Sequence, residues 1–184
     1  MPSESSAPPT QVLVIDGPAG AGKTTLAAAL ALLQDCVIVP MDLLYDGWEG
    51  LEAGVAQVER LLADLDAGRT PTYRRYDWIA GAYTETVTVP ATPLLVIEGV
   101  GSGGTERRAD CLVWIDAPAD VRRQRAEARG DFADQWERWA EHERAHFKRR
   151  RTRDRADLIL DSTREDLAAE LSRTGWFVRP GASG

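Results

Sequence analysis

Lysine is almost absent from this sequence. The 184 residues contain only Lys23 and Lys148, and the other 20 of the 22 basic residues are arginines. Because arginine fills nearly every basic surface position, a lysine in this chain indicates a position that requires an ammonium group. Lys23, which follows a glycine-rich segment, is the first candidate.

Cysteine and histidine are also scarce. Cys36 and Cys111 each begin an apolar run, which predicts core thiols in a reducing compartment and excludes a disulfide framework. His142 and His146 lie four residues apart in a charged segment with no evident third ligand. We therefore expect two solvated histidine side chains, and not a zinc site.

The chain lacks both long apolar runs and an excess of positive charge. It has no run of about 18 apolar residues, as a membrane span requires, and the Ser/Pro-rich residues 1–10 have no apolar core of a signal peptide. The formal net charge of -7 does not favour binding to nucleic acid or to acidic membranes. We expect a cytoplasmic protein without either partner. The sequence does not indicate its oligomeric state.

Short apolar runs alternate with helical stretches along residues 11–180, which predicts one domain between two tails, 1–10 and 181–184. Uninterrupted apolar strands separated by helices indicate an α/β fold in three layers, with a five-stranded parallel sheet covered on both faces. The expected strands are residues 12–15, 36–39, 94–97, 111–115 and 158–160, and the expected helices are 23–34, 51–65, 119–129, 136–150 and 164–173.

Residues 40–93 form a long insertion between the second and third expected strands. Within it, residues 83–89 alternate polar and apolar side chains, which predicts a half-exposed strand or one arm of a hairpin. Ligands of such sheets bind beyond the carboxyl ends of the strands, so we expect this insertion to contribute to the binding of a small-molecule substrate.

The segment Gly17-Pro-Ala-Gly-Ala-Gly-Lys-Thr24 matches the phosphate-loop pattern G-x-x-x-x-G-K-[ST] at every fixed position. In such a loop backbone N–H groups turn toward phosphates, the lysine reaches the β- and γ-phosphates, and the hydroxyl binds Mg²⁺. An apolar strand before it and a helix after it supply the required context. The sequence therefore predicts that ATP, or another nucleoside triphosphate, binds with Mg²⁺ at Gly17, Ala19, Gly20, Ala21, Gly22, Lys23, Thr24 and Thr25.

Other classes of phosphate-loop protein fit less well. Ras-like GTPases recognise guanine with an Asn/Thr-Lys-x-Asp element, and here the only other lysine, Lys148, is followed by two arginines. A chain of 184 residues also leaves little room for a transporter or motor ATPase domain. Small-molecule kinases remain.

Five further motifs follow the phosphate loop in a fixed order. They are Asp42-Leu-Leu-Tyr45, Tyr76-Asp-Trp78, Val96-Ile-Glu-Gly99, the set Asp120, Arg122, Arg125 and Arg129, and Arg153-Asp-Arg-Ala-Asp157. Over most of residues 11–161 their order and spacing resemble the uridine kinase family, in the group that also holds pantothenate kinase and phosphoribulokinase. The chain departs from the family on the acceptor side, at Leu44, at the histidine-free residues 79–83 and at the glycine-rich residues 101–104.

Carboxylates at strand ends are the candidate catalytic and metal-binding groups. Phosphoryl transfer to an alcohol needs a group that orients or accepts the hydroxyl proton, and Asp42 lies just past a strand, although it could instead be a turn residue. Glu98 ends a buried strand, where a carboxylate without a function is costly. We expect Glu98 to bind Mg²⁺ together with Thr24, or to contact the acceptor. Asp16 is either a local cap or a second magnesium ligand.

Arg122, Arg125 and Arg129 lie on one helix face. Guanidinium groups stabilise the charge of a transferring phosphoryl group, so we expect Arg122 and Arg125 to be catalytic, together with Lys23 and Asp42. Arg129 is expected to bind the nucleotide. The alternative is that the three arginines form a solvent-exposed stripe on the helix surface. Residues 130–155 are expected to form a lid in which one arginine of 144–155 reaches ATP. Trp136 and Trp139 are expected to pack this lid helix, and stacking on a base is the alternative. The resemblance implies acceptor contacts from Asp42, Tyr45, Tyr76, Asp77 and Glu98.

The function that fits best is transfer of the ATP γ-phosphoryl group to a hydroxyl of a small molecule, with a nucleoside of the uridine or cytidine type as the leading acceptor. A nucleoside monophosphate kinase is an alternative, in which Arg74 and Arg75 would bind the acceptor phosphate. A nucleotide-binding switch or accessory ATPase with little turnover is another, and it would have no need of a base at Asp42.

Overall fold

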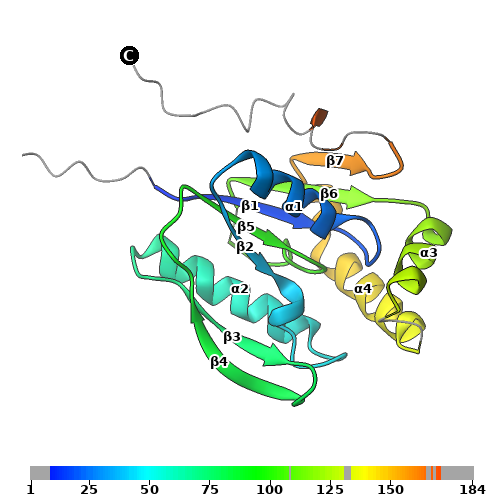
Figure 1. The fold of residues 1–184 in the computed structure, drawn as a ribbon, viewed down its shortest axis with the longest axis horizontal. Coiled ribbons are helices and arrows are strands. Elements are labelled where there is room, and N and C mark those ends of the chain that lie inside the picture. The colour runs from blue at the N-terminus through cyan, green and yellow to red at the C-terminus, as the bar shows by residue number, and fades with distance from the viewer. Residues whose placement is uncertain (1–8, 108, 131–133, 165–166, 168, 171–184) are drawn as a thin grey trace, which may run out of the picture.

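A parallel five-stranded sheet lies at the centre of the computed structural model, and helices cover both of its faces (Figure 1). The structure describes residues 9–107, 109–130, 134–164, 167 and 169–170. The strand order is β2-β5-β1-β6-β7, and every neighbouring pair is parallel, as the sequence predicts. The strands are β1 (Gln11–Asp16), β2 (Val37–Pro40), β5 (Leu94–Glu98), β6 (Cys111–Asp116) and β7 (Leu158–Asp161).

The helices lie close to their predicted positions, because apolar periodicity and the flanking glycines and prolines mark their limits. A short 3₁₀ turn, η1, leads from β2 into the insertion, which the sequence had not predicted as helical. The helices are α1 (Lys23–Leu33), η1 (Met41–Leu43), α2 (Leu51–Asp66), α3 (Ala119–Arg129), α4 (Trp136–Arg150) and α5 (Thr152–Arg155). The predicted helix 164–173 and both tails lie mostly outside the described residues.

Alternate residues of the central strand β1 belong to two separate cores. Leu13 and Ile15 pack with the apolar side chains of α1, whereas Val12 and Val14 pack with those of α2. A strand covered on both faces requires an apolar side chain at every position, which is why β1 is an uninterrupted apolar run. Because all five strands are parallel, their carboxyl ends meet at one edge of the sheet, where ligands bind in folds of this kind.

The insertion contains an antiparallel hairpin, β3 (Thr72–Asp77) and β4 (Ala82–Thr88). The expectation of a hairpin arm near residues 83–89 is confirmed, and β3 is its partner. Gln57 of α2 holds the hairpin: its Nε2 donates to the carbonyls of Leu44 and Arg74, and its Oε1 accepts from the Arg74 N–H at 2.7 Å. The hairpin is thereby fixed beside the loop that follows β2.

Helix α4 is packed into the body of the protein through His146. The expectation of two solvated histidines is wrong for this residue, whose side chain is 0% exposed. Its Nδ1 lies 2.8 Å from a carboxylate oxygen of Glu52, and a Cβ on Gly104 would lie 2.6 Å from its Nε2. The glycine-rich turn after β5 therefore makes the room that the buried imidazole occupies. His142 pairs separately, with Glu49 at 3.0 Å.

Glu52 predicts an acid-sensitive contribution to stability. Burial raises its pKa, but hydrogen bonds from His146, Arg149 and Arg150 outweigh that effect and lower the pKa from 4.5 to about 2. A carboxyl group with a depressed pKa in the folded state stabilises the protein above its unfolded pKa, and this contribution is lost as the pH falls from about 4.5 toward about 2. Because Glu52 is half exposed, solvent screening reduces this contribution to the free energy of unfolding to about 1 kcal/mol. Urea unfolding at pH 7 and pH 3 should show this loss in the wild type and a much smaller loss in Glu52→Gln; equal losses would contradict it.

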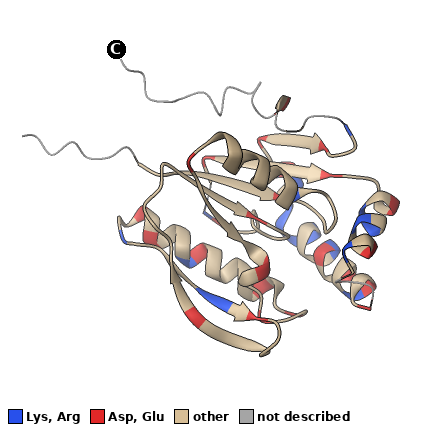
Figure 2. Ribbon diagram, viewed as in Figure 1, with Lys and Arg blue, Asp and Glu red and all other residues tan. Residues whose placement is uncertain are grey.

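Basic residues are concentrated along α3 and α4, with acidic residues interspersed among them (Figure 2). Of the helices in the described part of the chain, none combines the length and apolar character of a membrane span.

Candidate phosphoryl-transfer site

The phosphate loop joins β1 to α1 at the carboxyl edge of the sheet, and its glycines are required by close backbone approaches. Gly17 has φ +141°, and a Cβ there would lie 2.0 Å from the carbonyl oxygen of Ile115. Gly20 has φ +77°, and a Cβ there would lie 2.4 Å from the carbonyl oxygen of Arg122. The loop is therefore pressed against β6 and α3, and only glycine fits at these two positions.

Lys23 begins α1 with its ammonium group buried inside the loop. Its Nζ donates to the carbonyl oxygens of Gly17 and Pro18 at 2.8 and 2.9 Å. Burial lowers the pKa of Lys23, while the surrounding carboxylates, Glu98 and Glu143 foremost, act to raise it. This ammonium is the cationic centre of a group of acidic side chains.

A pocket of about 840 Å³ opens beside the loop, which is within the usual range for small-molecule sites. It is lined by the phosphate loop and the first residues of α1. Aromatic and apolar side chains of the loop after β2, the β3–β4 hairpin and α4 also line it. Its lining residues include Ala19, Gly20, Gly22, Lys23, Thr24, Thr25, Asp42, Leu43, Tyr45, Trp48, Trp78, Glu98, Gly99, Val100, Arg125, Arg129 and Trp139.

Three oxygen-bearing side chains, those of Thr24, Asp42 and Glu98, line the pocket. The Thr24 hydroxyl donates to the Glu98 carboxylate, with oxygen distances of 3.2 and 3.3 Å. Asp42, on η1, is exposed to the pocket. Partial desolvation raises the pKa of both carboxyl groups, and the charges of Lys23 and Arg129 oppose this. A carboxyl group whose pKa is raised in a pocket is suited to proton handling.

Thr24 and Glu98 have the ligand chemistry of a magnesium site. In the described part of the chain no three side chains of His, Cys, Asp or Glu form a metal-binding group. Mg²⁺ commonly binds to one or two protein oxygens, with substrate phosphates and water completing its coordination. The Thr24 hydroxyl and the Glu98 carboxylate could supply these protein oxygens.

Asp16 has a structural task in this structure. Its buried carboxylate accepts hydrogen bonds from the N–H groups of Gly17, Gly101 and Gly103 at 2.7–2.9 Å. Burial raises the pKa of Asp16, and these backbone hydrogen bonds act to lower it. The contacts favour the local-cap interpretation over a magnesium role, because they join the phosphate loop to the glycine-rich turn after β5.

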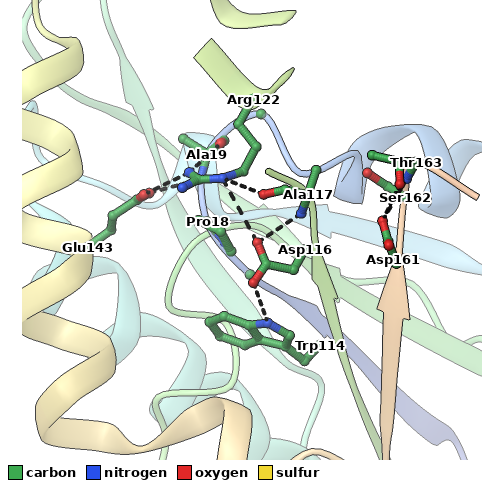
Figure 3. Close-up of polar contacts among 12 residues, drawn as sticks. Pro18, Ala19, Trp114, Asp116, Ala117, Arg122, Glu143, Asp161, Ser162 and Thr163 are labelled. Carbon is green, nitrogen blue, oxygen red and sulfur yellow. Dashed lines mark hydrogen bonds and ion pairs between the residues drawn. The ribbon is translucent and has the colours of Figure 1, made fainter. Parts of the chain in front are cut away.

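The three arginines of α3 have different surroundings. Arg125 and Arg129 line the pocket, and Arg125 also donates to the Ser162 hydroxyl at 2.7 Å and to the Gly20 carbonyl at 3.3 Å. Arg122 instead faces the backbone of the loop: it donates to the Ala117 and Ala19 carbonyls (Figure 3). Arg122 is not among the lining residues of the pocket, since these carbonyls and Glu143 engage its guanidinium group, and its contact with phosphate stays a prediction.

The arginine-rich run also departs from expectation. Across residues 144–155, all of which the structure describes, no arginine lines the pocket. Arg149 and Arg150 pair with Glu52, Arg151 pairs with Asp154, and Arg155 donates to carbonyls of the glycine-rich turn. From the expected lid region 130–155, Trp139 lines the pocket. Residues 131–133 lie outside the described residues.

The predicted acceptor residues divide into two groups. Tyr45 lines the pocket, but its ring is fully buried and its hydroxyl donates to the Val100 carbonyl at 2.7 Å. Tyr76 packs against Trp78 and Tyr83 with ring centroids 5.3 and 5.4 Å apart, and it does not line the pocket. Asp77 is half-buried, is not among the lining residues of the pocket, and accepts hydrogen bonds from the N–H groups of Ile79 and Ala80. These contacts are those of a turn residue, and its contact with an acceptor stays a prediction.

Three tryptophans, none of them among the predicted site residues, line the pocket together. The Trp48 ring centroid lies 5.0 Å from that of Trp78 and 6.1 Å from that of Trp139. Trp78 is fixed by its indole N–H, which donates to the carbonyl of Asp42 at 2.9 Å. The three residues come from three separate segments, so no local pattern groups them, although Trp78 belongs to the motif Tyr76-Asp-Trp78 and Trp139 to the expected lid.

Comparisons with known proteins show the fold but not the family. No family model and no curated protein matches the chain. Solved structures that are similar include a protein named "Possible Uridine Kinase" from Bacillus stearothermophilus, with a TM-score of 0.59 and 21% identity over 85% of this chain and 91% of that one. Shikimate kinases from Bacteroides thetaiotaomicron (TM-score 0.54, 15% identity, 89% and 96% covered) and Acinetobacter baumannii (0.52, 17%, 90% and 90%) are also similar. The chain has the α/β fold of these phosphate-loop kinases.

Proposed function

We propose that this chain is an ATP-dependent kinase that transfers the γ-phosphoryl group to a hydroxyl of a small, uncharged molecule, with a nucleoside as the leading acceptor. The observation that carries this proposal is the layout of a single pocket. The phosphate loop, the Asp42 side chain and three tryptophans all line it.

Each charged group of the pocket has a task in such a transfer. Lys23 and the loop N–H groups would bind the phosphates, and Arg125 and Arg129 would stabilise the charge of the group in transfer. Asp42 would orient the acceptor hydroxyl and accept its proton. Thr24 and Glu98 would hold Mg²⁺, which neutralises phosphate charge when it is bound.

The aromatic lining of the pocket supports an acceptor with a flat, uncharged body. Indole and phenol rings bury large areas and stack on planar rings, as on a nucleobase. The described lining residues include three cations: Lys23 in the phosphate loop, and Arg125 and Arg129 on α3. None comes from the hairpin or from α4, so the segments that carry the tryptophans offer no guanidinium for a second phosphate.

The monophosphate-kinase alternative depended on Arg74 and Arg75, and both lie elsewhere. Arg75 pairs with Glu85 across the hairpin at 2.7 Å. The Arg74 guanidinium lies over the ring of Tyr83, 4.5 Å from its centroid. Neither lines the pocket, which disfavours a phosphorylated acceptor.

The double variant Arg74→Ala/Arg75→Ala tests this distinction. With a nucleoside acceptor we expect kcat/KM to fall by less than about threefold, because neither arginine contacts the substrate. If the acceptor carried a phosphate, the loss of two charge-assisted contacts would lower kcat/KM by about 100-fold or more. Arg69→Ala/Arg153→Ala, which removes the same charge from exposed positions, is the control; a large loss confined to the hairpin variant would favour the monophosphate kinase.

A turnover screen identifies the acceptor directly. The full chain would be given ATP and Mg²⁺ with nucleosides, with nucleoside monophosphates and with vitamins that carry a free hydroxyl, and ADP release and product mass would be measured. We expect turnover with a nucleoside. ATP hydrolysis that no acceptor increases would favour the accessory ATPase.

A further inference from the structure

The backbone of Ala19, the third residue of the phosphate loop, is held on both sides by an ion pair (Figure 3). Its N–H donates to Oε2 of Glu143 at 2.8 Å, and its carbonyl accepts from Arg122 at 3.2 Å. Oε1 of Glu143 lies 3.4 Å from the same guanidinium. Glu143 belongs to α4 and Arg122 to α3, so side chains from two helices bind the backbone of one loop residue, on the two peptide units that flank its Cα.

Burial of the Glu143 carboxylate at this position is energetically unfavourable. Its side chain is 3% exposed, and a buried carboxylate is tolerated only when hydrogen bonds or opposite charge replace water. Burial raises the pKa of Glu143, and the Ala19 N–H, Lys23 and Arg122 act to lower it. The charged form is thus supported by the same loop N–H and the same lysine that the proposed function assigns to phosphate.

An anion at this position competes with a bound polyphosphate. Backbone N–H groups of a phosphate loop are anion donors, and a triphosphate introduces several negative charges beside Lys23. Like charges that share a poorly hydrated site repel one another. We propose that Glu143 is a resident anion of the phosphate loop, which competes with the polyphosphate for the Ala19 N–H and for the positive potential of Lys23 and so limits nucleotide affinity. This inference rests on the proposed binding of nucleotide by the loop.

Glu143→Gln tests the inference in the full chain. Glutamine keeps the length and one acceptor oxygen for the Ala19 N–H but removes the charge. We expect the Kd for ATP, measured by calorimetry without acceptor, to fall by about five- to tenfold, with a smaller decrease for ADP and a decrease at least as large as that for ATP with inorganic tripolyphosphate, which carries as many phosphates. Adenosine, which carries no phosphate, should bind as it does to the wild type. Glu141→Gln, which removes an exposed charge two residues earlier on α4, should change the Kd by less than twofold.

If Glu143 only stabilises the conformation of the phosphate loop, its substitution should leave ATP affinity unchanged or lower it. If Glu143→Gln, folded by circular dichroism and thermal melting, bound ATP as tightly as the wild type or more weakly, the inference would be overturned. A second measurement uses the wild type alone: the ¹³C resonance of the Glu143 carboxyl should shift when tripolyphosphate is added, and an unchanged resonance at saturation would also overturn it. If the wild type bound no polyphosphate at all, the proposed function would be rejected as well. If the wild type bound polyphosphate but Glu143→Gln bound it no more tightly, only the inference about Glu143 would fail.

Discussion

Lys23→Ala is expected to lower phosphoryl transfer by at least about 100-fold and to weaken ATP binding. The Lys23 ammonium is buried within the loop and is the only lysine that lines the pocket among the described residues. Removal of one preorganised charge donor from a site of this kind typically costs 10²–10³ in rate. Arg125 and Arg129 cannot replace it, because they approach from α3 and Arg125 is already bound to Ser162. Steady-state kinetics and calorimetry measure both effects.

Two further variants test whether a loss of activity in Lys23→Ala comes from the missing ammonium group. Lys148→Ala removes the other lysine, which is exposed on α4, and should leave rate and affinity unchanged. Lys23→Met keeps the buried apolar stem and removes only the ammonium, so it should match Lys23→Ala in activity while preserving the packing of α1. Transfer at the wild-type rate in both Lys23 variants would remove the basis for the phosphate-loop interpretation.

The sequence predicted the central sheet because its signals are local. A strand buried on both faces is an uninterrupted apolar run, and a helix shows its limits through caps and periodicity. The limits of α3, at Ala119 and Arg129, agree with prediction because Pro118 precedes it and Gly130 follows it in a left-handed conformation. The phosphate-loop motif likewise lies within eight consecutive residues.

The rest of the site depends on contacts between distant segments. Trp48, Trp78 and Trp139 meet only after the hairpin and α4 have packed against the loop that follows β2. His146 was expected in solvent because its neighbours in the sequence are charged, and its burial depends on a glycine-rich turn 42 or more residues earlier. The spacing of Arg122 and Arg125 places both on one helix face, but only the tertiary structure shows that one faces the loop backbone and the other the pocket.

Asp42 is the residue on which the distinction between an enzyme and a binding protein depends. It is carried by η1 directly after β2, and Trp78 binds the backbone carbonyl of the same residue, which fixes the turn. Its carboxylate is left to face the pocket together with Lys23 and Arg129, whose charges act on its pKa. A nucleotide-binding switch would have no use for such a group beside an acceptor-sized aromatic pocket.

Asp42→Asn is therefore expected to separate transfer from binding. Asparagine keeps the shape of the side chain, so ATP and Mg²⁺ should bind within a few-fold of the wild type, whereas transfer should fall by about 10²–10⁴, the usual contribution of a positioned general base. Because transition states of phosphoryl transfer are loose, the lower end of that range is expected.

The pH dependence of transfer gives a second measurement on Asp42. Since partial desolvation raises the pKa of Asp42, wild-type transfer should decline as the pH falls through a value above the pKa of an ordinary aspartate, and Asp42→Asn should lack this decline at low pH. Asp64→Asn, at a surface ion pair with Arg69, is the matched control and should behave as the wild type. Equal kcat values and equal pH profiles for Asp42→Asn and the wild type would show that Asp42 is a turn residue, and the kinase proposal would then rest on Glu98 and the arginines of α3 alone.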